Sequence, residues 1–193
     1  MKFAHTTIAA ALALASSGAV FAQAGSVQRD VNQQQRIEQG LQSGSLNTRE
    51  AARLEREETK VEKDQARAMR DGNLSPAEKA RLGREENRVS RDIYREKHDA
   101  QTGNPNSASS QRMQADVQRN INQQTRIEQG TQSGSLTTRE TAKLEAGQAR
   151  DTRAEARAGA DGKVNAHEQR RMQKKENRQS ARIQREKHDA QTK

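Results

Sequence analysis

The chain has 193 residues, with 35 Lys and Arg residues against 26 Asp and Glu residues and a formal net charge of +9. Only 30% of the residues are hydrophobic, Cys and Trp are absent, and the mean hydropathy is -1.25. This composition excludes a large enzyme with an apolar core and an integral membrane protein. Because Cys is absent, no disulfide compensates for a thin core.

An apolar run opens the chain. Lys2 precedes an apolar stretch over residues 8–15, and small residues follow up to the Val-Phe-Ala sequence that ends at Ala22. A basic start, a short apolar core and small residues before a cut are typical of a secretory signal peptide. The stretch is shorter than the about 20 apolar residues that a membrane span needs. We therefore predict a signal peptide over 1–22, cut after Ala22, and an exported chain, periplasmic or secreted, that does not span the membrane.

One unit then occurs twice. Residues 28–102 align without a gap to residues 118–192, and 41 of the 75 aligned positions are identical. The intervening segment, 103–117, contains Gly, Asn, Pro and Ser and is typical of a flexible polar linker. The sequence therefore predicts a first copy over 23–102, a linker over 103–117 and a second copy over 118–193.

A shorter repeat, spaced by 28 residues, lies within each copy. Each occurrence has a small polar residue, Gly, any residue, an aliphatic residue, a helix-capping residue and then Glu three positions later. The predicted N-caps are Asn47, Ser75, Thr137 and Asn165, and the Glu residues that complete capping boxes are Glu50, Glu78, Glu140 and Glu168. We therefore expect helices to begin near residues 48, 76, 138 and 166, with another helix entering before Gly40 and before Gly130.

The apolar stripes on these helices are narrow. Leu82, Val89 and Ile93 follow one another at spacings of seven and four, which indicates a single buried helical face. In the second copy, polar residues such as Asp151 and Gln179 replace two of the valines of the first copy. The predicted fold class is all-α, as two tandem three-helix units with a marginal core. The second unit fluctuates unless it docks on the first unit or on a partner.

The four turns resemble the 12-residue calcium loop of the EF-hand family. With each capping-box Glu at position 12, Gly falls at position 6 and an aliphatic residue at position 8 in every turn. The resemblance implies a pair of helix-loop-helix hands in each copy, with calcium as the ligand. The candidate ligands that it implies are Ser43, Asn47, Glu50, Asp71, Ser75, Glu78, Ser133, Thr137, Glu140, Asp161, Asn165 and Glu168.

The ligand positions depart from the family. Position 1, an Asp in the family, is Gln39, Arg67, Gln129 or Arg157 here. Calcium needs six to eight oxygen ligands and several negative charges, whereas each loop offers one or two carboxylates. The sequence therefore favours capped turns without a metal cofactor, and weak binding of calcium or another divalent ion is the alternative.

Positive charge is concentrated in the second copy. Residues 28–102 carry 16 basic and 15 acidic residues, whereas residues 118–192 carry 16 basic and 10 acidic residues. The cations that cluster there are Arg170, Arg171, Lys174, Lys175 and Arg178. A cluster of this kind on one helix predicts a solvated basic face, or as an alternative a site for an anionic polymer. Tyr94 is the single aromatic residue after Ala22, so nucleic acid, whose bases stack on aromatic rings, is disfavoured as a partner.

No pattern in the sequence indicates catalysis. No Ser-His-Asp arrangement, Gly-rich phosphate loop or pair of buried carboxylates stands out, and His98 and His188 each follow a Lys at the end of a predicted helix, where a cation is favoured. We therefore predict a non-enzymatic accessory or binding protein of the cell envelope. Its partner is an envelope protein or a second copy of the chain.

Overall fold

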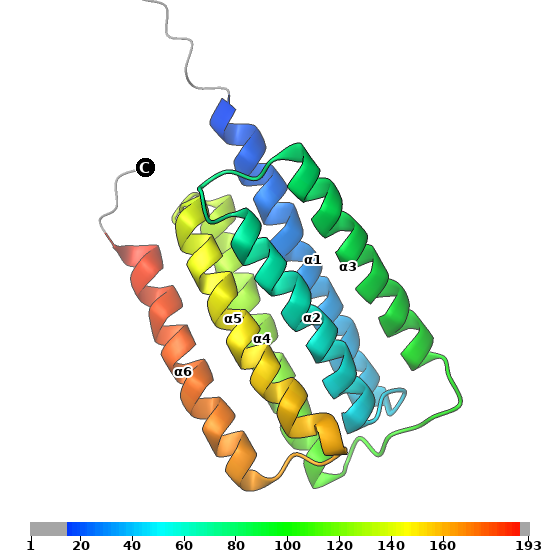
Figure 1. Ribbon diagram of the computed structural model, residues 1–193. Helices are drawn as coiled ribbons and strands as arrows, with labels where there is room; N and C mark the ends of the chain where they lie inside the picture. The colour runs from blue at the N-terminus through cyan, green and yellow to red at the C-terminus, as the bar shows by residue number, and fades with distance from the viewer. Residues whose placement is uncertain (1–14, 190–193) are drawn as a thin grey trace, which may run out of the picture.

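The computed structural model describes residues 15–189 and is helical nearly throughout (Figure 1). The helices are α1 (Ala15–Ser43), α2 (Thr48–Ala68), α3 (Pro76–Lys97), α4 (Ala108–Gln132), α5 (Thr138–Ala158) and α6 (Ala166–His188), with a short 3-10 turn, η1 (Gly159–Asp161). No strand occurs within these residues. The predicted all-α class is confirmed, and each copy of the sequence contributes three helices.

The four helix starts lie where the repeat predicts them, because all four capping boxes form. In α2, Asn47 Oδ1 accepts hydrogen bonds from the backbone N–H groups of Arg49 and Glu50, at 2.9 and 3.0 Å. Glu50 Oε2 accepts from the Asn47 N–H at 2.9 Å. The Gly of each turn has a φ between 68° and 91°, the left-handed region that Gly adopts without strain. The repeat thus encodes one turn four times.

The helix before each first turn runs three residues or so beyond Gly40 and Gly130 instead of ending there. These two glycines make room for the aliphatic residue of the following turn. A Cβ on Gly40 would lie 2.5 Å from Leu46 Cδ1, and a Cβ on Gly130 would lie 2.6 Å from Leu136 Cδ1. The Leu46 and Leu136 N–H groups donate to the carbonyls of these same glycines at 2.9 Å. Each turn is therefore closed tightly onto its preceding helix.

The two copies pack against each other as one bundle. Helices α1, α2, α4 and α5 form its centre, and α3 and α6 flank it on opposite sides (Figure 1). Contacts between the copies are reciprocal: Arg49 donates to the Asp161 carbonyl at 2.9 Å, and its counterpart Arg139 donates to the Asp71 carbonyl at 3.3 Å. Equivalent residues that exchange contacts in this way are the signature of a two-fold interface, here within one chain.

The apolar core is shared by both copies, so the expected arrangement of two separate tandem units is not confirmed. Ile37 and Leu54 of the first copy lie in one cluster with Ile121, Val164 and Met172 of the second copy. Conversely, Val27 of the first copy belongs to the cluster of Ile127, Leu136, Leu144 and Ile183. The narrow stripes seen in the sequence are completed by packing of one copy against the other.

The segment predicted as a flexible linker, 103–117, is only partly a connection. Helix α4 already begins at Ala108, with Ser107 as its N-cap, because Met113 and Val117 are fully buried in the shared core. The remaining connection is held to the first turn, where the Gly103 N–H donates to the Gly44 carbonyl at 2.8 Å.

The predicted signal peptide, 1–22, lies for the most part outside the described residues, and α1 as described begins at Ala15 within it. Within the described part of the chain, no helix is both long and apolar enough to cross a membrane. The cut after Ala22 stays a prediction.

Candidate functional site: a cationic groove between α5 and α6

The twelve candidate metal ligands lie in the four turns, where their oxygens make the hydrogen bonds of the turns themselves. The capping residues and Glu residues bond to each other's backbone N–H groups, as described for Asn47 and Glu50. Ser43 and Ser133 donate to the carbonyls of Gly40 and Gly130 at 3.2 and 3.3 Å. Asp71 and Asp161 accept from the backbone N–H two residues later, each at 2.9 Å. Binding of calcium inside these loops stays a prediction.

Of these twelve residues, only Glu50 and Glu140 belong to a group of carboxylates that lie close enough together to share a metal ion. Their companions come from the ends of α3 and α6 and not from the turns. No companion was among the candidates from the sequence, because residues 46 positions away carry no local spacing signal. These groups are taken up below.

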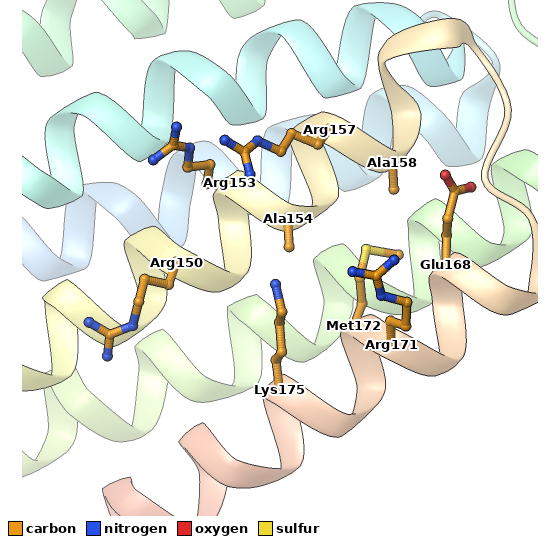
Figure 2. Close-up of a pocket in the computed structure, with 9 residues that line it drawn as sticks. All are labelled: Arg150, Arg153, Ala154, Arg157, Ala158, Glu168, Arg171, Met172 and Lys175. Carbon is orange, nitrogen blue, oxygen red and sulfur yellow. The ribbon is translucent and has the colours of Figure 1, made fainter.

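Eight cations line a groove between α5 and α6. One part of this groove, about 450 Å³ in volume, is lined by three arginines of α5, by Ala154 and Ala158, and by residues of α6 (Figure 2). Figure 2 shows Lys175 reaching from α6 toward α5, where the small side chain of Ala154 leaves room for it. The adjoining part continues along the same two helices. The cations that line the two parts are Arg150, Arg153, Arg157, Arg171, Lys175, Arg178, Arg182 and Arg185.

The structure divides the basic cluster that the sequence singled out. Arg171, Lys175 and Arg178 line the groove, whereas Arg170 and Lys174 are exposed on α6 and do not line it. The α5 half of the groove was missed by the sequence analysis. Its signal was present, since Arg150, Arg153 and Arg157 recur at spacings of three and four and therefore share one helical face.

Few acidic groups oppose these cations. Glu168 and Asp151 are the acidic residues that line the groove. Asp151 is buried, and burial raises its pKa to about 6 although Lys175 and Arg150 act to lower it. Among the ion pairs of the described residues, only one involves a cation of the groove, Arg182 with Glu186 at 3.9 Å.

The equivalent surface of the first copy, between α2 and α3, has acids among its cations. Two acids, Glu57 and Glu85, line it together with six cations: Arg56, Lys60, Arg81, Arg84, Arg88 and Arg91. Lys60 pairs with Glu85 at 3.1 Å and with Asp64 at 3.5 Å, and Arg88 lies 3.9 Å from Asp92. The four acidic residues Glu57, Asp64, Glu85 and Asp92 correspond, 90 positions later, to Gly147, Ala154, Lys175 and Arg182. The second copy thus keeps Lys60 and Arg88 as Arg150 and Arg178 and has lost the acids that pair with them.

The interior holds many carboxyl groups and no basic side chain. None of the Lys, Arg and His residues between 25 and 189 is buried. Burial raises the pKa of Glu55 and of Glu145 to about 7, even though amides of Gln34 and Gln124 donate to them at 3.0 and 3.2 Å. Glu58, fully buried, has no hydrogen-bond partner for either oxygen, and burial followed by repulsion from Glu55 raises its pKa well above the usual range.

The surroundings of one of these buried carboxyl groups differ between the two copies. Glu86 of α3 accepts from Ser26 Oγ at 2.5 Å and from Arg29 at 3.0 Å, and Gln65 lies 3.4 Å away. In the second copy, the residues equivalent to Ser26 and Gln65 are Asp116 and Glu155. Glu176, the counterpart of Glu86 in the second copy, retains an ion pair with Arg119 at 3.3 Å. Burial and the neighbouring Asp116 raise the pKa of Glu176 to about 8. The carboxyl of Glu176 therefore binds a proton more readily than an ordinary Glu does.

The histidines at the helix ends lie where the sequence analysis places them. His98 is the C-cap of α3, and its Nδ1 lies 2.7 Å from the Tyr94 carbonyl. His188 ends α6 in the same way, with its Nδ1 2.8 Å from the Gln184 carbonyl. Neither belongs to a group of potential metal ligands within the described residues.

No protein-family model, curated protein or solved structure matches this chain. The arrangement of charges on the molecule is therefore the basis on which a function is proposed.

Proposed function

We propose that this chain is an exported, non-enzymatic binding protein of the cell envelope whose second copy binds a linear anionic polymer in the α5/α6 groove. The observation that carries the proposal is the difference between the two equivalent surfaces. On the α2/α3 surface, Glu85 and Asp92 pair with Lys60 and Arg88. The α5/α6 groove has Lys175 and Arg182 at the positions of these two acids, and seven of its eight cations have no ion-pair partner among the described residues.

The spacing of the cations fits an extended ligand. On α6, residues 171, 175, 178, 182 and 185 alternate steps of four and three, which keeps them on one face of the helix. From first to last they extend for about 21 Å at the rise of an α-helix. The arginines of α5 run beside them. Two parallel rows of cations neutralise a polymer with regularly spaced charges better than a single small anion, which would occupy one end.

Arginine favours phosphate or carboxylate oxygens, because its planar guanidinium group donates two parallel hydrogen bonds to them. The groove offers no aromatic platform for a nucleic-acid base, and Tyr94, the exposed aromatic residue, lies on α3. Tyr94 is also the only large hydrophobic residue among 25–189 that is exposed. The surface therefore supports recognition of charge along a polymer, without reading of bases and without a large apolar contact.

Binding of polyphosphate and of polygalacturonate to the mature chain tests the proposal, one polymer carrying phosphate and the other carboxylate groups. The variant Lys175→Glu with Arg182→Asp installs the residues of the first copy at the equivalent positions. We expect its affinity at low salt to fall about 10- to 100-fold, and the dependence of log K on log salt to become shallower by about two.

A matched control is the variant Arg170→Glu with Lys174→Asp, which changes the net charge by the same amount on exposed positions of α6 outside the groove. We expect this control to lose affinity only a few-fold, through the long-range field. Equal losses in both variants would show that net charge and not the groove holds the polymer, and would contradict the proposal. Absence of binding to either polymer by the unaltered chain would contradict it as well.

A further inference from the structure

Three carboxylates meet at one end of each copy. In the first copy they are Glu50 from the first turn of α2, Glu96 from the last turn of α3, and Asp99 just beyond that helix. One oxygen of each lies within 4.8 Å of the others. The second copy brings together the equivalent residues, Glu140, Glu186 and Asp189. We refer to these groups as the two carboxylate triads.

One Glu of each triad, Glu50 or Glu140, has a buried oxygen without a hydrogen-bond partner. Glu50 is 5% exposed and Glu140 is 2% exposed. In both residues Oε2 accepts from the backbone N–H of the helix N-cap, Asn47 or Thr137. In both, Oε1 is buried and has no hydrogen-bond donor. A buried carboxylate oxygen left without a donor carries a free-energy penalty that a cation would remove.

We propose that each carboxylate triad binds one divalent cation with a preference for oxygen ligands, such as calcium. Three carboxylates supply the negative charge that calcium sites require, and water completes the coordination in weak sites of this class. The proposed site joins the start of one helix to the end of another. It differs from an EF-hand loop, which takes its ligands from one continuous stretch of 12 residues.

The local charges agree with a cation at this place. Burial raises the pKa of Glu50, and repulsion from Asp99 and Glu96 adds to the effect. Only Arg53 offsets this repulsion by an ion pair, at 3.2 Å from Glu96. The end of α3 also presents the negative end of its helix dipole, which favours a cation. The Asp99 oxygens accept from the backbone and side chain of Gln101, so Asp99 is held in place and keeps lone pairs for a metal.

Calorimetric titration of calcium into the chelator-treated mature chain tests this proposal. We expect two calcium ions per chain with dissociation constants in the range of about 0.1 to 1 mM, typical of extracellular sites. The variant Glu50→Gln should bind one ion, and Glu50→Gln with Glu140→Gln should bind none. Gln keeps the capping box, so the helix start is preserved while the charge is removed.

The chain supplies its own matched control. Glu78 and Glu168 occupy the same capping-box position at the starts of α3 and α6, yet neither belongs to a triad. Glu78→Gln with Glu168→Gln should therefore still bind two ions. A second variant, Asp99→Asn, removes a triad charge outside the helices, and we expect it to bind one ion.

Three results would overturn the triads as sites. They are no calcium binding at millimolar concentrations, binding that survives Glu50→Gln with Glu140→Gln, and a loss of binding in the Glu78/Glu168 control. The last result would favour the EF-hand loops, which predict four equivalent ions per chain. The polymer-binding groove shares no residue with the triads, so these outcomes leave it untouched.

Discussion

The two copies have the same helices, the same four caps and the same turns, yet they distribute charge in opposite ways. On the outside, the first copy pairs Lys60 with Glu85, whereas the second places Lys175 at the position of that acid. On the inside, the first copy surrounds Glu86 with donors, whereas the second surrounds Glu176 with acids such as Asp116. Both copies bury carboxyl groups, but the surface of the second copy is the more cationic of the two.

This difference shows which parts of the repeat hold the fold and which are free to change. Every turn keeps a left-handed Gly, a capping residue and a Glu, because each of these satisfies a backbone requirement. The helix faces between the turns have no such requirement. A surface ion pair contributes only about 0–1 kcal/mol to stability. Its loss in the second copy therefore costs the fold little stability and leaves cations available to a ligand.

The largest effect is expected from separating the copies. A chain of residues 103–193 contains α4, α5 and α6 but lacks Val27, Ile37 and Leu54, against which its apolar residues pack. We expect it to show no cooperative thermal transition by circular dichroism, and we expect the chain of residues 23–193 to unfold cooperatively. A cooperative transition of the separate copy would show that the shared core is dispensable.

The next effect concerns pH. The carboxyls of Glu55 and Glu145 have their pKa raised by burial from 4.5 to about 7. Below about pH 4.5 they are protonated in the folded and the unfolded chain alike. Between 4.5 and 7 the unfolded chain releases these protons while the folded chain keeps them, so the free energy of unfolding falls as the pH rises. Each group contributes roughly 2–3 kcal/mol to this fall. Urea unfolding at pH 5 and at pH 8 measures it, and greater stability at pH 8 would contradict it.

A single substitution that gives the first copy a residue of the second tests the same pH effect at one position. Glu58 corresponds to Gln148, so Glu58→Gln makes the first copy like the second at this buried position. We expect the variant to be more stable by about 1–3 kcal/mol at pH 8, since it removes a buried carboxylate without partners, and unchanged near pH 4. Glu78→Gln is the contrasting control. Hydrogen bonds from Ser75 lower the pKa of Glu78, so its loss should destabilise, if at all, at the higher pH.

The sequence was sufficient for what depends on neighbours along the chain. Asn47 and Glu50, three residues apart, predicted a helix start that the structure has, and the same spacing succeeded at the other three turns. The packing of the copies was not predictable in this way. Glu55 and Gln34 are polar, and nothing in the sequence marks them as buried, yet both are buried in the bundle and bonded to each other. A polar residue gives no periodic signal that separates a buried face from a solvated one.

The same limit applies to the residues of the candidate sites: the sequence reveals those that are close along the chain and not those that only the fold brings together. Arg171, Lys175 and Arg178 were found because they are close together on one helix, whereas the arginines of α5 joined them only in the folded chain. Glu50 was recognised as a candidate ligand through its turn. Glu96 was not, because α2 and α3 must fold side by side before the two carboxylates meet. A site whose residues come from two helices can be recognised only in the tertiary structure, even when the residues of each helix stand out in the sequence.

The smallest expected effect comes from giving the first copy the surface charges of the second. The variant Glu85→Lys with Asp92→Arg removes one of the two acids that pair with Lys60 and the acid that pairs with Arg88, and it places the residues of the α5/α6 groove on the α2/α3 surface. If unpaired cations make the groove a site, polymer affinity should rise about three- to tenfold, and the salt dependence should steepen. The gain is limited because Glu57 and Asp64 remain. Unfolding should change by less than about 1 kcal/mol, since only exposed ion pairs are lost. Isothermal titration with polyphosphate measures the first effect and urea unfolding the second.

A variant that gains four positive charges yet binds no more tightly would show that the α5/α6 groove depends on its shape, and that the difference in charge between the copies is secondary.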